Sequence, residues 1–266
     1  MPRINVGDCE IHYEERGTGD LVVLIHGLGS SIRDWELQIP AISERYRVIA
    51  IDVRGHGQSD KPRGPYSVVK FAADVATVLD KLQVGPAHIV GISMGGMIAF
   101  QLAVDSPASI RSLVIVNSGP ALVLRTLKEK FAIWSRRVAL RLVGLPALAK
   151  KVAAMNFPHP EQAALRDKLA SRLADNDPAI YRASMEALVG WSVEDRIGSI
   201  QCPTLVVAAD QDYTPVAAKR AYAAKIPNAR VVVIDNSRHV TPFDQPEAFN
   251  RVVLDFLSEQ TKEGRS

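Results

Sequence analysis

The pentapeptide Gly91-Ile92-Ser93-Met94-Gly95 constrains the fold of this chain more than any other stretch. An apolar run, 87–90, precedes it, and a second apolar segment, 94–104, follows it. A Gly-x-Ser-x-Gly motif between a strand and a helix makes a turn so tight that the serine backbone is strained, usually with a positive φ, and its hydroxyl points into a cleft. The glycines are required because side chains there would collide across the turn. We therefore predict Ser93 as a nucleophile, with an oxyanion-stabilising helix N-terminus behind it.

Six short apolar runs alternate with segments of helical periodicity. The runs are 21–25, 47–51, 87–92, 113–116, 204–209 and 231–234. Uninterrupted apolar runs of this length are typical of strands that helices cover on both faces. The alternation predicts an α/β fold with a mostly parallel, doubly wound sheet. An antiparallel pair near 4–6 and 11–15 is expected before it.

The alternation stops between residue 121 and about residue 195, where only helical patterns occur. Apolar residues at helical spacing mark its first part: Leu127, Phe131, Trp134, Val138, Leu142 and Leu145. An all-helical insertion between two strands of such a sheet lies at the carboxyl edge of the strands, where ligands bind. The sequence therefore predicts a core formed by 1–120 and 196–266, and an all-helical lid formed by 121–195.

A serine nucleophile needs a base within hydrogen-bonding reach, and the base needs a group that orients it. His239 lies in a loop between the last predicted strand and the last predicted helix, from which it would reach back to Ser93, so we predict it as the base. The other five histidines are predicted to be structural, with His26 and His56 bracing glycine turns.

Either of two aspartates that follow the run 204–209 could orient His239. Asp212 is favoured over Asp210, because the chain needs a few residues to turn toward the histidine. Asp210 would then cap the turn with its side chain.

The oxyanion that forms at a substrate carbonyl needs preorganised N–H donors. The amide of Met94, directly after Ser93, is one candidate. The amide of Leu28, in the glycine-containing loop after the run 21–25, is the other.

With these residues in the order Ser93, Asp212, His239, the chain resembles the α/β-hydrolase fold superfamily over nearly its whole length. Four segments carry the resemblance: His26-Gly27-Leu28-Gly29, 52–59, Gly91–Gly96 and 236–239. Where the family often has a glycine before the acid loop, this chain has alanines at 208 and 209, which leaves the choice between the two aspartates open. The nearest branch by resemblance is that of capped serine esterases and 3-oxoadipate enol-lactonases.

The resemblance implies a serine hydrolase that cleaves small carboxylic esters through an acyl-enzyme, without cofactor or metal. A lactone or a carbon–carbon bond could be the target of the same triad, which would make the protein an enol-lactonase or a carbon–carbon bond hydrolase. A third possibility is a ligand-binding receptor on a hydrolase scaffold with vestigial turnover. Aspartate-nucleophile members of the superfamily are disfavoured because Ser93 stands at the elbow.

The predicted lid supplies aromatic and sulfur-containing side chains that could roof an apolar pocket: Phe131, Trp134, Met155, Phe157 and Trp191. Residues at helical spacing can equally pack a lid onto a sheet. We expect some of the five to contact substrate.

The lid is also basic, with eight lysines and arginines and one acid, Glu129, between Arg125 and Lys151. Arg136, Arg137 and Arg141 lie opposite the apolar stripe and form either a solvated face or a surface that attracts anionic substrates or a membrane.

Composition limits the partners of the chain. The net charge of +3 over 266 residues is too small to indicate nucleic-acid binding. No run approaches the roughly 20 apolar residues of a membrane span, and the first residues lack the apolar core of a signal peptide. The two cysteines, Cys9 and Cys202, have no metal-ligand spacing. We expect a cytoplasmic protein whose partner is a small ester or lactone; the pattern does not specify an oligomeric state.

Overall fold

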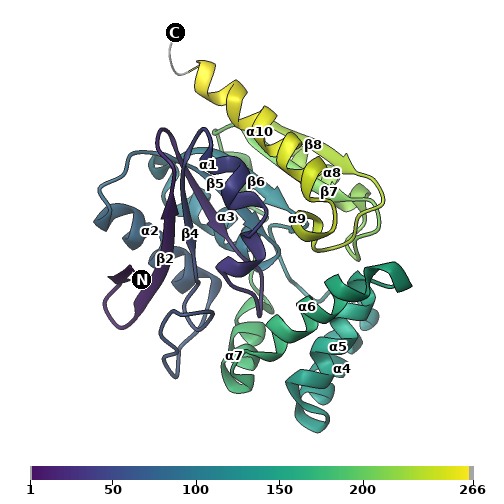
Figure 1. Ribbon diagram of the computed structural model, residues 1–266. Helices are drawn as coiled ribbons and strands as arrows, with labels where there is room; N and C mark the ends of the chain where they lie inside the picture. The colour runs from purple at the N-terminus through teal and green to yellow at the C-terminus, as the bar shows by residue number, and fades with distance from the viewer. Residues whose placement is uncertain (1, 264–266) are drawn as a thin grey trace.

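A computed structural model describes residues 2–263, with side chains through residue 260. It has a single eight-stranded sheet in the order β1-β2-β4-β3-β5-β6-β7-β8 (Figure 1). The strands are β1 (Arg3–Asn5), β2 (Glu10–Arg16), β3 (Leu21–Ile25), β4 (Arg47–Ile51), β5 (Ala87–Ile92), β6 (Ile110–Val116), β7 (Thr204–Ala209) and β8 (Ala229–Ile234). β1 and β2 pair antiparallel, β2 pairs antiparallel with β4, and the other pairings are parallel. The predicted α/β fold with a mostly parallel sheet is confirmed; β6 and β8 begin two or three residues earlier than the apolar runs indicate.

The α-helices of the core are α1 (Gln38–Ser43), α2 (Val68–Lys81), α3 (Met94–Asp105), α8 (Val216–Ala223), α9 (Thr241–Asp244) and α10 (Pro246–Glu263). Short 3-10 helices are η1 (Ile32–Trp35), η2 (Pro107–Ser109), η3 (Pro160–Gln162) and η4 (Ile197–Ser199).

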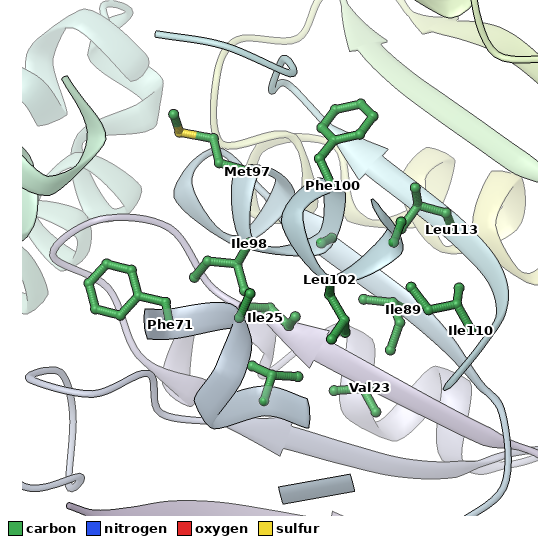
Figure 2. Packing of buried hydrophobic residues seen from close by; sticks show 14 of the residues in the cluster. Val23, Ile25, Phe71, Ile89, Met97, Ile98, Phe100, Leu102, Ile110 and Leu113 are labelled. Carbon is green, nitrogen blue, oxygen red and sulfur yellow. The ribbon is translucent and has the colours of Figure 1, made fainter. Parts of the chain in front are cut away.

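Helices cover both faces of the central strands, which divide their side chains between two buried clusters. Val23 and Ile25 of β3 pack into the same buried cluster as α2 and α3, whereas Val22 and Leu24 pack into a second cluster with α10. Figure 2 shows the first cluster, where Phe71 of α2 and Ile98 of α3 lie over β3. Because both faces are buried, the strands need apolar residues at every position rather than at alternate ones.

Between β6 and β7 the chain forms helices without strands, as the sequence predicts. They are α4 (Leu127–Leu142), α5 (Gly144–Asn156), α6 (Ala163–Ala174) and α7 (Pro178–Leu188), and they gather at one end of the core in Figure 1. The two ends of the segment meet, because the Leu122 amide donates to the Trp191 carbonyl and the Gly190 amide to the Leu122 carbonyl, each at 2.8 Å. We call residues 121–195 the lid.

The apolar stripe of α4 does not face the interior of the lid, which corrects the expectation that it packs against the core or a pocket. Leu127, Phe131, Trp134 and Leu142 are 83%, 64%, 54% and 76% exposed. Periodicity defines one apolar face but not the direction in which that face points. Leu145, at the start of α5, is buried.

The opposite side of α4 turns inward and carries Arg136, which donates to the Tyr181 hydroxyl on α7. Arg137 forms a bidentate ion pair with Glu186 on α7 but stays exposed, as predicted. Arg141 is exposed too; it lies along an edge of the apolar stripe, not opposite it as expected, and has no acid partner within residues 2–263. Arg136 and Arg137 therefore join α4 to α7.

Candidate active site

Ser93 occupies the turn between the end of β5 and the start of α3. Its φ is 54° and its ψ is −117°, a conformation that L-residues rarely adopt. A Cβ on Gly91 would lie 2.3 Å from the Gly95 carbonyl oxygen, and a Cβ on Gly95 would lie 2.1 Å from the Ile25 carbonyl oxygen. Glycine is thus required on both sides of the serine, and the strained turn has the geometry that the motif predicts.

The loop after β3 lies directly against Ser93. A Cβ built on Gly27 would be 3.4 Å from the Ser93 Cβ and 3.9 Å from its Oγ. Leu28, the next residue, packs against buried clusters of both the core and the lid. Met94 is the first residue of α3, where amide groups have no partner within the helix. The two predicted oxyanion donors therefore stand on the two segments that flank the serine.

His26 holds this loop in shape. Its Nδ1 lies 2.7 Å from the Gly27 carbonyl oxygen, and its Nε2 accepts from the Val53 amide at 2.9 Å. These partners assign the proton to Nδ1 of a neutral ring. Burial lowers the pKa of His26, so the ring stays neutral and the loop geometry does not change with pH near neutrality.

The predicted base and the favoured acid are in contact. His239 Nδ1 lies 2.8 Å from Asp212 Oδ1, and the Asp212 side chain is fully buried. Asp210 has a different role from the predicted turn cap: its Oδ1 accepts from the Ser237 amide at 2.9 Å. Asp210 therefore fastens the histidine loop to the end of β7, while Asp212 contacts the imidazole.

Lys219 of α8 is a residue of this site that sequence analysis missed. Its side chain is completely buried, and its Nζ donates to Asp212 Oδ2 at 2.5 Å, to the Thr214 carbonyl at 3.0 Å and to Asn117 Oδ1 at 3.2 Å. Burial alone would raise the pKa of Asp212, but the hydrogen bonds and charges of His239 and Lys219 outweigh it and lower that pKa. A lysine three residues before the buried Tyr222, on the apolar face of α8, was the signal available in the sequence.

Asn117, directly after β6, links three loops around the same acid and histidine. Its amide nitrogen donates to the His239 carbonyl at 2.9 Å and to Thr241 Oγ1 at 2.8 Å, and its Oδ1 accepts from the Ala209 amide at 2.8 Å. Its φ of 42° is a conformation that asparagine tolerates better than most residues. Asn117 thereby fixes the position of His239 relative to the strand ends.

Tyr213, next to the acid, covers the imidazole. The two rings stack with centroids 4.1 Å apart and an interplanar angle of 31°. Tyr213 is 65% exposed as a residue; loss of solvent around its phenol and the neighbouring charge of Asp212 raise the pKa of the phenol, which stays protonated. Within residues 2–263 the structure gives no hydrogen bond between Ser93 Oγ and His239 Nε2; such contacts are often long without substrate and tighten when it binds.

The five lid residues predicted to bind substrate fall into three groups. Phe157 is fully buried and packs edge-on against Phe243 with ring centroids 5.9 Å apart, which favours packing over substrate contact. Trp191 is half-buried, and its Nε1 donates to Gln101 at 2.7 Å. Phe131, Trp134 and Met155 are more than half exposed, and the structure gives them no contact with Ser93, Asp212 or His239.

A small apolar hollow adjoins the site. Ile92, next to Ser93, and Val240, next to His239, line it together with Leu169 of the lid, Phe243 and Trp35. A wider hollow lies at the amino ends of β7 and β8, between Pro203 and Arg230, at the sheet edge opposite the serine. Of these two hollows, the first is the one lined by the chain neighbours of Ser93 and His239.

The described residues do not form a cluster of potential metal ligands. Among residues 2–263 no group of three or more histidine, cysteine, aspartate or glutamate side chains could hold an ion together. No helix in that part of the chain is long and apolar enough to cross a membrane.

Comparison with known proteins shows the family to which this chain belongs. The family model of the alpha/beta hydrolase fold matches residues 20–246, and the chain belongs to this family. Within it the chain lies in the enol-lactonase-like branch and is a hydrolase.

Three relatives support that placement. A protein of Azorhizobium caulinodans provisionally named carbamate hydrolase RutD is 31% identical over 97% of this chain and 99% of its own length. The 3-oxoadipate enol-lactonase 2 of Acinetobacter baylyi is 31% identical over 92% of each chain. The crystal structure of the enol-lactonase from Burkholderia xenovorans LB400 superposes with a TM-score of 0.88 at 27% identity, covering 97% of this chain and all of the other.

Proposed function

We propose that the protein is a serine hydrolase that cleaves small carboxylic esters through an acyl-enzyme, with Ser93, His239 and Asp212 as its triad. The observation that carries this proposal is the contact of His239 Nδ1 with Asp212 Oδ1 at 2.8 Å, in a chain whose Ser93 is held at φ 54° on the turn after β5. A base oriented by a buried acid and a serine on a strained turn are the parts that acyl transfer requires.

In the first half of the reaction, Ser93 Oγ attacks the carbonyl carbon while His239 Nε2 takes the hydroxyl proton. The amides of Leu28 and Met94 donate to the oxyanion of the tetrahedral intermediate. The intermediate collapses, the carbon–oxygen bond to the alcohol breaks, and His239 returns the proton to the departing oxygen.

In the second half, His239 takes a proton from water, and the resulting hydroxide equivalent attacks the acyl carbon. The second tetrahedral intermediate expels Ser93, which regains its proton from His239. Asp212 remains ionised throughout, because its lowered pKa keeps it a carboxylate that stabilises the imidazolium.

A lactone substrate is the second candidate, and two observations favour it. The relatives include enol-lactonases. In addition, Arg136 of the lid donates to Tyr181, and its Nε is buried without a partner within residues 2–263. A cation of the lid with an unused donor suits a lactone that carries a carboxylate. The other candidates, a carbon–carbon bond hydrolase and a receptor with vestigial turnover, have no comparable observation in their favour.

We also propose the cytoplasm as the site of action; two cysteines that form no disulfide, Cys9 and Cys202, suit a reducing compartment. The lid at 121–195 is proposed as the cap over the substrate.

One experiment separates the candidates. Turnover is measured on p-nitrophenyl esters of increasing acyl length and on a carboxylated enol-lactone, with the Ser93→Ala variant as the blank. The proposal expects multiple turnovers on short esters. Preference for the lactone that disappears selectively in Arg136→Gln would select the second candidate, and a single turnover on every substrate would support the receptor.

A further inference from the structure

Helix α4 presents its apolar stripe to the outside of the molecule. Leu127, Phe131, Trp134 and Leu142 follow one another at helical spacing, and each is more than half exposed. Leu140, on the opposite side of the helix, is the one fully buried residue of α4, and it packs with Leu145 and Leu148 of α5. A surface helix of a globular protein normally buries its apolar stripe. The reversed orientation of α4 therefore leaves a long apolar face to be covered.

The apolar face extends beyond the end of the helix and contains an aromatic pair. The centroids of the Phe131 and Trp134 rings lie 5.5 Å apart. Val143, which follows Leu142 at the corner between α4 and α5, is 60% exposed. With a rise of about 1.5 Å per residue, the stripe is roughly 24 Å long.

Unpaired cations flank the stripe. At 100° per residue, Lys128 lies along one edge of the stripe, and Lys130 and Arg141 lie along the other. All three are exposed, and within residues 2–263 the structure gives none of them an acid partner. The helix's acid, Glu129, instead accepts from the Arg125 and Thr126 amides at 2.8 Å as part of a capping box.

The charge of the whole chain is segregated in the same way. Residues 125–151 carry eight basic side chains and one acidic one, a formal +7, whereas the chain totals +3. The remainder of the molecule therefore carries −4. Arg125 pairs with Glu194 and Arg137 with Glu186, so within residues 2–263 six of the eight cations have no acid partner. An excess of cations on one segment of a chain whose remainder is negative gives the molecule an orientation in an electric field.

We propose that α4 is a docking surface for an anionic phospholipid bilayer, with its apolar stripe inserted among the headgroups and Lys128, Lys130 and Arg141 at the level of the phosphates. Tryptophan, phenylalanine and leucine on one face, with lysine and arginine beside them, are the composition of helices that lie in a membrane interface. The long stems of the lysines and arginine allow their charges to stay in water while the stripe is immersed. Within residues 2–263 the structure gives this surface no contact with Ser93 or His239. The membrane proposal therefore does not depend on whether the protein hydrolyses esters.

A second copy of the chain fits this face less well. A symmetric dimer through α4 would bring two formally +7 segments together, and like charges across an interface disfavour association. Two copies and an acidic protein partner are nevertheless distinct outcomes of the test.

Vesicle flotation at low salt tests the proposal directly. The protein should float with vesicles of equimolar phosphatidylglycerol and phosphatidylcholine, should not float with phosphatidylcholine alone, and should be released as salt rises. The double variant Lys130→Glu/Arg141→Glu should bind at least about tenfold more weakly, because each cation near an anionic surface contributes substantially. The matched control is Arg45→Glu/Lys81→Glu, the same charge change at exposed, unpaired positions of the core; it should float like the parent.

Trp134 supplies a second readout of the same event. It is 54% exposed, whereas Trp35 is 1% exposed and Trp191 is half-buried. Anionic vesicles should shift the tryptophan emission of the parent to shorter wavelength, and Trp134→Phe should abolish most of that shift. Leu127→Ser/Leu142→Ser, at two exposed positions, should weaken binding even where salt has already screened the cations.

Three results would overturn the proposal. They are failure of the parent to bind anionic vesicles, equal weakening in the lid and core charge variants, and a parent that forms a dimer which Leu127→Ser/Leu142→Ser dissociates without any vesicle binding. The last would assign the face to a second copy. Melting temperatures of all variants verify that each is folded.

Discussion

The Nζ atom of Lys219 lies 2.5 Å from Oδ2 of Asp212, and both side chains are completely inaccessible to solvent. The same carboxylate uses its other oxygen for His239. A buried acid that is shared between a fixed cation and an imidazole has its charge compensated before any substrate arrives. Lys219 therefore stabilises the ionised form of Asp212 and lowers its pKa.

Lys219→Met should shift the pH dependence of kcat/KM. Lys219 lowers the pKa of Asp212, so its removal should raise the pH at which that carboxylate is protonated and move the acidic limb of the profile to higher pH. Loss of one partner of a buried ion pair should also cost on the order of 3–5 kcal/mol of unfolding free energy. Activity measured from pH 5 to 9, together with urea unfolding, checks both effects. Lys225→Met, at an exposed lysine just beyond α8, serves as the control. A uniformly lower rate with an unmoved limb would reduce Lys219 to a structural residue.

The two aspartates of the acid loop should respond differently to the same change. Asp212→Asn removes the acceptor of His239 Nδ1 and should lower kcat by roughly 10⁴-fold, as the loss of an orienting acid does in such triads. Asp210→Asn alters the contact with the Ser237 amide and should act mainly on stability. Steady-state kinetics and melting temperatures of both variants decide the assignment. A larger kinetic loss in Asp210→Asn would transfer the role of the acid to Asp210.

Trp134 and Phe157 should separate substrate contact from packing. Phe157 is fully buried against Phe243, so Phe157→Ala should cost about 3–5 kcal/mol of unfolding free energy. Trp134 is largely exposed, so Trp134→Ala should cost less than about 1 kcal/mol. If Trp134 also borders the substrate, the ranking of acyl chains should change in Trp134→Ala. An unchanged ranking with an unchanged melting temperature would remove Trp134 from the proposed pocket.

Buried neutral histidines should make the fold sensitive to acid. Burial lowers the pKa of His88 to about 4 from the ordinary 6.5, and that of His56 to about 3. Between the ordinary pKa of 6.5 and the lowered pKa in the folded protein, the unfolded chain binds more protons than the folded chain. The free energy of unfolding should therefore fall as pH decreases from 6.5 toward 4. The contribution of His88 is roughly 3 kcal/mol. Urea unfolding at pH 7 and pH 4.5 should show that the free energy of unfolding falls less in His88→Asn than in the parent. Equal losses in the two proteins would exclude His88 as a cause.

Much of the fold and the core of the site could be predicted from the sequence, because their signals are local. The Gly-x-Ser-x-Gly turn and the uninterrupted apolar strands arise from sterics and burial that act within a few residues. The pairing of His239 with Asp212 was within reach once both were placed after strands, since parallel strand ends meet at one edge of the sheet.

Other features depend on tertiary contacts that no local pattern encodes. Lysine is almost never fully buried unless it is paired, so the position of Lys219 could be understood only after Asp212 and Asn117 were seen beside it. The outward orientation of the α4 stripe could not be predicted, because periodicity gives a face and not its direction. The inward position of Arg136 follows from the same reversal.

Covalent labelling identifies whether Ser93 is the nucleophile. The parent is treated with an organophosphate, the adduct is located by mass spectrometry, and kcat/KM on a short aryl ester is compared between the parent and Ser93→Ala. The account predicts a single adduct on Ser93, no adduct in the variant, and a loss of kcat/KM on the order of 10³-fold or more with an unchanged melting temperature. An adduct on another residue, or a variant that hydrolyses the ester at the parental rate, would contradict it.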